Sequence, residues 1–131
     1  MSASPTRLRL RLGRRQRLRG PREFARVRAE GERRVCGCLI ANWRRLPDGE
    51  ESLLGIVTSR KVGGSVVRSR ARRMMREAYR LQRGNLSVPV ALVLVARPSL
   101  ATKSFETVCR DLRRCFQESG LWRMPAPGAA P

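Results

Sequence analysis

Residues 88–96, which read VPVALVLVA, constrain the fold of this chain more than any other segment. A strand with one face in solvent alternates apolar and polar side chains, whereas a strand covered on both faces is apolar at almost every position. The segment contains no polar side chain. It is also far shorter than the roughly 20 apolar residues that cross a membrane. It therefore predicts a sheet strand with packing on both faces, ending before Pro98.

The segments before this strand predict one helix and two further strands. Residues 21–31 predict a short helix, because a proline suits its first turn and a glycine its end. Residues 35–43 and 52–59 predict strands, with an Asp-Gly turn signal between them. The first of these is long enough to break at a β-bulge, so that residues 33–45 would count as two strands.

Two longer helices are predicted from apolar positions that recur at helical spacing. Residues 65–83 have an apolar stripe formed by Val67, Ala71, Met74, Ala78 and Leu81. A basic stripe runs beside it, formed by Arg68, Arg72, Arg76 and Arg80. Residues 102–118 predict the last helix, with an inner side of Phe105, Val108, Leu112 and either Cys115 or Phe116.

These segments in order give α-β-β-α-β-α, with an extra strand if the first one breaks. We predict the α+β class, as a two-layer sandwich with helices packed on a roughly four-stranded sheet. A chain of 131 residues typically forms one domain, which we place at residues 21–119. Residues 1–20 contain seven arginines and no acid, and predict a flexible basic arm. The Gly, Pro and Ala-rich residues 120–131 predict a disordered tail.

The charge of the chain points to a polyanionic partner. Its 29 basic residues, 27 of them arginine, outnumber its 10 acidic residues and give a net charge of +19. GC-rich codon usage would account for arginine in place of lysine, but not for the excess of positive charge. The balance favours a nucleic acid as partner and argues against an ordinary enzyme for a neutral substrate.

Residues for metal and acid–base chemistry are scarce. The chain has no histidine, which removes the most common general acid–base group. The four cysteines are spaced as C-x-C and C-x5-C, neither of which is a usual zinc motif, so we expect reduced, partly buried thiols and no zinc. Three acids share the turn at residues 48–51 and the others are scattered. The sequence therefore lacks the converging carboxylates of a self-sufficient two-metal nuclease.

The densest basic segment is residues 59–80, which contain a single acid, Glu77. Guanidinium groups bind phosphate through paired hydrogen bonds and stack on bases, and a helix N-terminus adds free N–H groups for a phosphate. A solvated basic helix face is the simpler explanation, but the overall charge makes it the weaker one. We predict that this segment binds RNA through Arg60, Lys61, Arg68, Ser69, Arg70, Arg72, Arg73 and Arg76.

The spacing of this segment closely resembles the signature of the bacterial ribonuclease P protein family, S-K-K-x-G-x-A-V-x-R-N-R-x-K-R-x-x-R-E-x-x-R. The matching positions here include Ser59, Arg60, Lys61, Gly63, Arg68, Arg70, Arg72, Arg73, Arg76, Glu77 and Arg80. The resemblance extends to Arg17-Leu18, Phe24, Gly31, Leu54-Gly55 and Ala96-Arg97-Pro98. It covers about residues 14–118, and so long a spaced motif is far more specific than a run of arginines.

The resemblance implies a protein subunit that joins a catalytic RNA and helps to remove the 5′ leader from precursor tRNA. The RNA would hold most of the Mg²⁺ needed for hydrolysis. The protein would supply no catalytic residue, organic cofactor or zinc, and it would act in the cytoplasm without a membrane or an obligate protein partner. The resemblance also implies a left-handed β-α-β crossover, against the usual right-handed rule. The expected leader-binding cleft comprises Phe24, Arg28, Asn42, Val57 and Ser59.

Three positions depart from the family pattern. Ser69 stands where the family has the central Asn of an Arg-Asn-Arg motif, so it keeps a hydroxyl but lacks an amide. Arg28 and Asn42 stand where the family often has aromatic residues of the cleft, while Trp43 is expected on the opposite face of its strand. We therefore expect base stacking to contribute less in this chain, and charge to contribute more.

Three other functions are compatible with a chain this basic. A structural ribosomal protein would share the arginine-rich ends and the small α+β domain, and it would copurify with ribosomal subunits. A double-stranded DNA binder is disfavoured because no helix-turn-helix pair with a base-reading Asn or Gln is evident. A stand-alone RNA enzyme is disfavoured by the missing histidine and carboxylate cluster. The spaced motif in residues 59–80, together with Phe24, favours the ribonuclease P resemblance.

Overall fold

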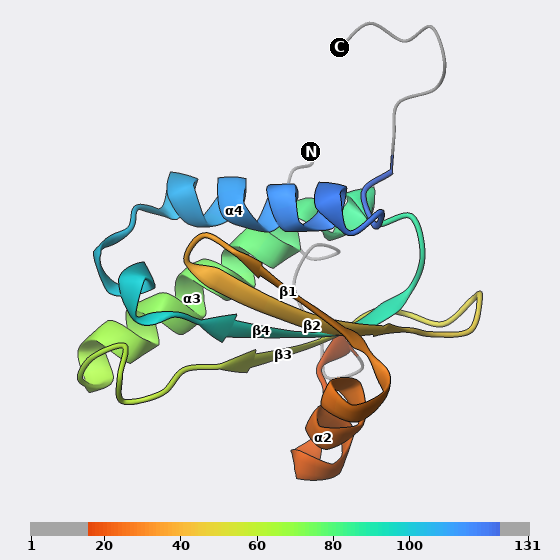
Figure 1. Ribbon diagram of the computed structural model, residues 1–131, viewed down its shortest axis with the longest axis horizontal. Coiled ribbons are helices and arrows are strands. Elements are labelled where there is room, and N and C mark those ends of the chain that lie inside the picture. Colours follow the sequence, from red (N-terminus) through yellow and green to blue (C-terminus); the bar gives the residue numbers. More distant parts are fainter. Residues whose placement is uncertain (1–15, 124–131) are drawn as a thin grey trace, which may run out of the picture.

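Strand β4 (Val90–Ala96) is an inner strand of a four-stranded sheet in the computed structural model, which describes residues 16–123 (Figure 1). The strand order is β1-β2-β4-β3, where β1 is Glu32–Cys36, β2 is Leu39–Arg45 and β3 is Leu53–Val57. Strand β4 pairs antiparallel with β2 and parallel with β3. The apolar segment therefore lies inside the sheet, as its composition predicts.

Alternate side chains of β4 join two different apolar clusters. The even-numbered ones join the larger cluster, beneath α3 (Ser65–Gln82) and α4 (Phe105–Glu118). The odd-numbered ones join a smaller cluster with Val27 of α2 (Gly20–Glu30). Figure 1 shows α2 on one side of the sheet and α4 on the other. The predicted α+β class is confirmed, and α2 adds a partial third layer to the two-layer sandwich.

Strands β1 and β2 form a tight hairpin. The alternative of two strands within residues 33–45 is therefore right in number, but a reversing turn and not a β-bulge separates them. Cys36 pairs with Leu39, and Gly37 and Cys38 form the two-residue turn between them. Gly37 has a φ of +58°, which favours glycine, and the Asp111 carboxylate occupies the place that its side chain would fill. Buried Asp111 also accepts a hydrogen bond from the Cys38 N–H at 3.0 Å. A residue of α4 thus fixes this turn.

Helix α3 buries the middle of the predicted apolar stripe but not its two ends. Ala71, Met74 and Ala78 are buried, Val67 is half-buried, and Leu81 is 51% exposed. The buried side continues instead through Tyr79 and Gln82. At 100° per residue, Gln82 lies between the buried residues Ala78 and Tyr79 on the helix surface, whereas Leu81 lies beyond Ala78 on the side away from Tyr79, where it meets solvent. The inward position predicted for Leu81 is therefore wrong.

Helix α4 begins later than predicted, because a short 3₁₀ turn (Pro98–Thr102) precedes it. Ser104 caps the helix: its Oγ accepts a hydrogen bond from the Thr107 N–H at 3.2 Å. The inner side of α4 carries the predicted apolar residues, Val108, Leu112, Cys115 and Phe116. A second 3₁₀ turn (Arg83–Asn85) follows α3.

The packed domain extends beyond the predicted limits at both ends. The Leu18 N–H donates to the Leu54 carbonyl at 3.0 Å, so the last part of the predicted arm is held against β3. At the other end, Leu121 is 1% exposed, and the Trp122 ring stacks on Phe116 with centroids 6.4 Å apart. The predicted tail is therefore wrong for residues 120–123. The rest of the arm and tail, residues 1–15 and 124–131, lie outside the described residues.

Helix α3 connects the parallel neighbours β3 and β4, which gives the expected β-α-β unit. The left-handed sense of this crossover stays a prediction. None of the helices within residues 16–123 combines the length and the apolar composition of a membrane span. The four cysteines are free thiols. Burial is the main cause that raises the pKa of Cys38 and Cys115 to about 12.

Candidate RNA-binding site

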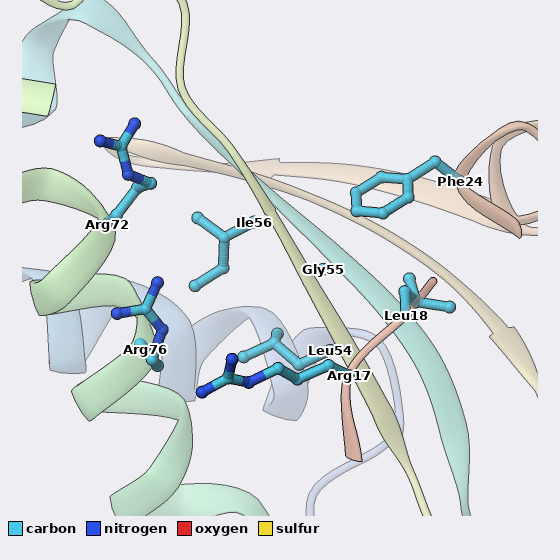
Figure 2. Close-up of a pocket in the computed structure, with 8 residues that line it drawn as sticks. All are labelled: Arg17, Leu18, Phe24, Leu54, Gly55, Ile56, Arg72 and Arg76. Atoms are coloured by element: carbon cyan, nitrogen blue, oxygen red, sulfur yellow. The ribbon is translucent and has the colours of Figure 1, made fainter. Parts of the chain in front are cut away.

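A cleft of about 180 Å³ lies at the β3 edge of the sheet, between the N-terminal segment and α3 (Figure 2). Strand β3 has β4 as its strand neighbour, and on its other side Arg17 forms a single bridge with Leu54. The residues that line the cleft are Arg17, Leu18, Phe24, Leu54, Gly55, Ile56, Arg72 and Arg76. The cleft therefore combines apolar side chains of a sheet edge with arginines from two separate segments.

Phe24 and Gly55 form one wall of this cleft. A Cβ atom on Gly55 would lie 2.5 Å from Cζ of Phe24 and 3.0 Å from Cδ1 of Leu18, so the absence of a side chain lets the ring lie directly against β3. Phe24 is half-buried and packs against the smaller apolar cluster. Its ring therefore serves the packing of α2 and also presents an aromatic surface to the cleft.

Three arginines form the opposite wall. Figure 2 shows the side chains of Arg17 and Arg76 extending toward one another from the N-terminal segment and α3, with Arg72 one turn away. Arg76 is an exposed residue, yet partial burial of its guanidinium and then the charges of Arg17 and Arg72 lower its pKa. Arginine remains charged at neutral pH. No carboxylate is among the described residues that line the cleft, so an anion would relieve this repulsion.

Arg72 is held in position by two hydroxyl groups. Its Nη1 donates to Oγ1 of Thr58 at 2.8 Å, and its Nη2 donates to Oγ of Ser69 at 3.3 Å. Ser69, which departs from the family pattern, thus contacts an arginine of the cleft from its exposed position on α3. The guanidinium of Arg72 keeps further N–H groups for a ligand.

The arginines of α3 have different surroundings. Arg80 is ion-paired with Glu77, with its Nε donating to Oε1 at 3.0 Å, and this contact lowers the pKa of the Glu77 carboxyl. Arg70 donates to the backbone carbonyls of Ala101 and Lys103 at 3.4 and 3.0 Å, so it ties α3 to the segment before α4. Within the predicted basic stripe, Arg72 and Arg76 therefore line the cleft, whereas Arg80 is engaged by Glu77.

The other predicted RNA-binding residues surround the start of α3. Arg60 and Lys61 are exposed in the loop before the helix, and Arg73 is exposed on the helix itself. Arg68 is half-buried, and its Nε is buried without a hydrogen-bond partner in the part of the chain that the structure describes. These four residues are not among those that line the cleft.

Two rows of residues cross the α2 side of the sheet. The strand register places Asn42, Val93 and Gly55 in one row and Ile40, Val95 and Val57 in the next. The three residues of the second row are half-buried. Because these apolar residues are half-buried, this part of the sheet face is open to solvent. The neighbouring row contains Gly55, which lines the cleft, so the open part of the face lies beside the cleft.

The five residues of the expected leader-binding cleft are not gathered in one place. Phe24 lines the cleft, and Val57 lies in the open row. Asn42 is 7% exposed within the first row. Arg28 is exposed in the last turn of α2, and Ser59 is exposed after β3, where its Oγ accepts a hydrogen bond from the next loop.

Sequence reasoning misses five of the residues that line the cleft. Arg17 and Leu18 are predicted in a flexible arm, and Leu54, Gly55 and Ile56 are predicted in a strand but not in the site. The dipeptides Arg17-Leu18 and Leu54-Gly55 were a usable signal, since both match the pattern. Their pairing across the edge of the sheet is a tertiary contact that no local rule shows.

The fold and this cleft define a class: a small α+β protein that presents an aromatic ring, an open sheet face and converging arginines is an RNA-binding protein. The Ribonuclease P family model matches residues 12–120. A "Ribonuclease P protein component" of Roseiflexus castenholzii is 35% identical over 107 residues, covering 80% of this chain and 86% of that protein. One of Clostridium novyi is 32% identical over 108 residues, covering 82% and 96%.

Solved structures agree with these relatives. The ribonuclease P protein of Thermotoga maritima has a TM-score of 0.70 at 28% identity, covering 79% of this chain and 97% of that one. That of Staphylococcus aureus has a TM-score of 0.73 at 17% identity, covering 82% and 97%, and supports the fold alone. The chain belongs to the ribonuclease P protein family, whose members are RNA-binding components in tRNA processing. This membership favours the motif-based interpretation over a ribosomal role.

Proposed function

We propose that this protein binds the catalytic RNA of ribonuclease P and the 5′ leader of precursor tRNA, and that it assists Mg²⁺-dependent removal of the leader by the RNA in the cytoplasm. The observation that carries the proposal is the convergence of Arg17, Arg72 and Arg76 on a cleft that contains Phe24. A single-stranded leader offers both of the groups that such a cleft binds, phosphates and unstacked bases.

Each partner has its own surface in this proposal. The leader lies across the open row of the sheet and the cleft, with a phosphate at the arginines and a base against the Phe24 ring. The catalytic RNA contacts the basic surface of the loop before α3 and of the helix itself, which includes Arg60, Lys61 and Arg73. Binding of both RNAs to one cationic protein lowers the repulsion between their phosphates.

The cleft does not fit a divalent cation. Cations of the Mg²⁺ type take oxygen ligands, chiefly carboxylates and phosphates, whereas three guanidinium groups and apolar side chains line this cleft. We therefore assign the Mg²⁺ ions to the RNA, and the proposal gives the protein no catalytic group. Its contribution is to bind the leader and to reduce the Mg²⁺ concentration that the RNA requires.

The test uses the full-length protein, its cognate catalytic RNA, and precursor and mature tRNA. We expect the protein alone to leave precursor tRNA intact, and the complex to cleave it at Mg²⁺ concentrations where the RNA alone is slow. Arg17→Ala and Arg76→Ala are each expected to lower affinity for precursor tRNA about tenfold, as for one lost charged hydrogen bond, with little effect on mature tRNA.

Arg34→Ala is the matched control, because Arg34 is an exposed arginine on β1, at the opposite edge of the sheet, and it pairs with Glu118 of α4 on the other face. It removes the same charge and is expected to change precursor affinity little. Equal losses from all three variants would show that net charge alone governs binding. Cleavage by protein free of any RNA would contradict the proposed division of roles.

A further inference from the structure

A second cleft, of about 400 Å³, lies between the C-terminal end of α3 and the first three turns of α4. It shares no residue with the cleft at the β3 edge. Its volume is in the range of small-molecule sites, roughly 300–1,000 Å³. Nothing in the proposed leader-binding role accounts for this cleft.

The apolar side chains that line this cleft are partly exposed to solvent. Leu81, the predicted core residue that the orientation of α3 leaves half-exposed, lines the cleft together with half-buried Phe105. Trp122 also lines it, and is held by its ring stacking on Phe116 and by a hydrogen bond from its backbone N–H to the Phe116 carbonyl at 3.1 Å. The cleft thus has a fixed indole beside two apolar side chains.

One buried polar side chain at the cleft has an unsatisfied acceptor. Gln82 is 8% exposed, and its Nε2 donates to the Cys109 carbonyl at 2.9 Å, which orients the amide. Its Oε1 is buried and has no donor among the described residues. Buried acceptors in proteins are nearly always hydrogen-bonded, so a ligand that brings an N–H group would complete this site.

The rim of the cleft is cationic. Arg110 and Arg113 are exposed on successive turns of α4, and neither forms an ion pair within the described residues. Glu106 is the carboxylate among the described residues that line the cleft. By contrast, Arg114 of the same helix is ion-paired with Glu118. Two guanidinium groups beside an aromatic and apolar cleft suit a ligand with a flat ring and a phosphate.

We propose that this cleft binds one unpaired nucleotide of the catalytic RNA. The base contacts Trp122 and Leu81, an N–H group of the base donates to Oε1 of Gln82, and the flanking phosphates contact Arg110 and Arg113. Because α3 and α4 cover the sheet face opposite α2, we assign this cleft to the catalytic RNA and not to the leader. The inference rests on the proposed function in that it takes RNA as the partner.

The direct test measures tryptophan fluorescence of the full-length protein with short single-stranded oligonucleotides. In the Trp43→Phe variant, Trp122 is the single tryptophan, and we expect an oligonucleotide to quench it. An abasic oligonucleotide of equal length, which has the same phosphates and no bases, is expected to quench far less. Equal quenching by both, or by neither, would overturn the proposal.

Two substitutions in this background locate the site. Leu81→Glu changes an exposed side chain, so the fold is retained, and it is expected to weaken quenching at least about tenfold because it places a carboxylate against the base. Arg113→Ala is expected to weaken it several-fold, whereas its neighbour Arg114→Ala, the matched control, is expected to change it little. Equal effects of Arg113→Ala and Arg114→Ala would contradict a specific contact.

The source of the nucleotide is tested in the complex. 4-Thiouridine is incorporated either in the catalytic RNA or in the leader, and cross-links to the peptide that contains Trp122 are identified by mass spectrometry. We expect cross-links from the catalytic RNA, and cross-links from the leader alone would overturn the assignment. Selective binding of precursor tRNA is measured in parallel for Leu81→Glu and Arg76→Ala. A loss of this selectivity tests the leader cleft and is expected for Arg76→Ala. A loss of Trp122 quenching with retained precursor selectivity concerns the second cleft alone and is expected for Leu81→Glu.

Discussion

On the face of the sheet covered by α3 and α4, Leu92, Leu94 and Phe116 have no exposed surface, whereas on the α2 face Phe24 and Val57 are only half-buried. Strand β4 contributes apolar side chains to both faces, so the strand itself does not cause the difference. The helices that cover each face cause it. Helices of 18 and 14 residues lie on the first face, and one helix of 11 residues lies on the second.

This comparison shows that a short cover can leave part of an apolar sheet face available for a ligand. The closed face provides most of the apolar burial that stabilises the domain. The open face carries a smaller cluster, and next to it the arginines of the cleft have no carboxylate among the described lining residues. Substitutions on the closed face should therefore reduce stability, and those on the open face should mainly reduce RNA binding.

The largest effect is expected from Phe116→Ala on the closed face. Phe116 is fully buried in α4, and the Trp122 ring stacks on it. Removal of the ring leaves a cavity, so we expect the free energy of unfolding to fall by about 3–5 kcal/mol, as measured by denaturant titration. The protein that remains folded should bind precursor and mature tRNA with an unchanged ratio. A loss below about 1 kcal/mol would show that the closed face is not the main source of stability.

A smaller loss of stability, with a selective loss of binding, is expected from Phe24→Ala on the open face. Because the ring is half-buried, we expect the free energy of unfolding to fall by about 1–2 kcal/mol. Affinity for precursor tRNA should fall by about 1–3 kcal/mol, as for one lost base stack, whereas affinity for mature tRNA should not change. Thermal melting and titration with both tRNAs measure the two effects. If the free energy of unfolding fell as much as for Phe116→Ala, and the affinities for precursor and mature tRNA changed alike, Phe24 would be a core residue without a role in binding.

The elements that could be predicted from sequence are those with a strong local pattern. Strand β4 and helix α3 are examples, because an apolar run and a repeated 3.6-residue spacing report directly on burial. The hairpin at Gly37 could not be predicted in the same way. Its turn interrupts an apolar run without a strong turn signal, and Asp111, which accepts a hydrogen bond from Cys38, lies 73 residues further along the chain.

The candidate site shows the same limit. The spaced motif indicated the arginines of α3 and the family, and Phe24 was expected in the cleft. Which of those arginines lack an ion pair depends on tertiary contacts, such as the approach of Arg17 to Arg76. The face on which α2 lies also depends on packing and not on its own sequence, so the extent of the open sheet could not be predicted.

Alkaline pH should destabilise the closed face by a moderate amount. Cys38 and Cys115 are buried there, and burial raises the pKa of each from 9.0 to about 12. The contribution of these thiols to the free energy of unfolding is therefore complete below their pKa in the unfolded chain, 9.0, and is lost as pH rises from 9 toward 12. We expect a loss of about 1 kcal/mol per thiol at pH 9.5 relative to pH 7.5, measured by denaturant titration under reducing conditions.

Variants with Cys38→Ala or Cys115→Ala separate the two thiols. Each should show a clearly smaller pH dependence in this range, because one titrating thiol is removed, while Cys109, whose pKa burial also raises, remains in both variants. Tyr79, whose pKa is also raised to about 12 by burial, begins to contribute above its ordinary pKa of 10.0, so measurements stop at pH 9.5. A pH dependence that is unchanged in both variants would exclude the thiols as its cause.

The smallest effect on stability is expected from Ser69→Asn, on the exposed side of α3. Ser69 accepts a hydrogen bond from Arg72 at 3.3 Å, and the carbonyl oxygen of an Asn side chain can accept the same bond from a slightly greater reach. The residue is exposed, so we expect the free energy of unfolding to change by less than about 0.5 kcal/mol. Because Asn also restores a donor that the family pattern has at this position, affinity for the catalytic RNA should be retained or increased, as measured by titration with the labelled RNA. Ser69→Ala is the matched control: it removes one of the two acceptors of Arg72, leaves the shorter bond to Thr58, and should weaken precursor binding slightly. A folded Ser69→Asn protein with strongly reduced RNA affinity would show that the RNA-binding surface of α3 is adapted to the shorter side chain.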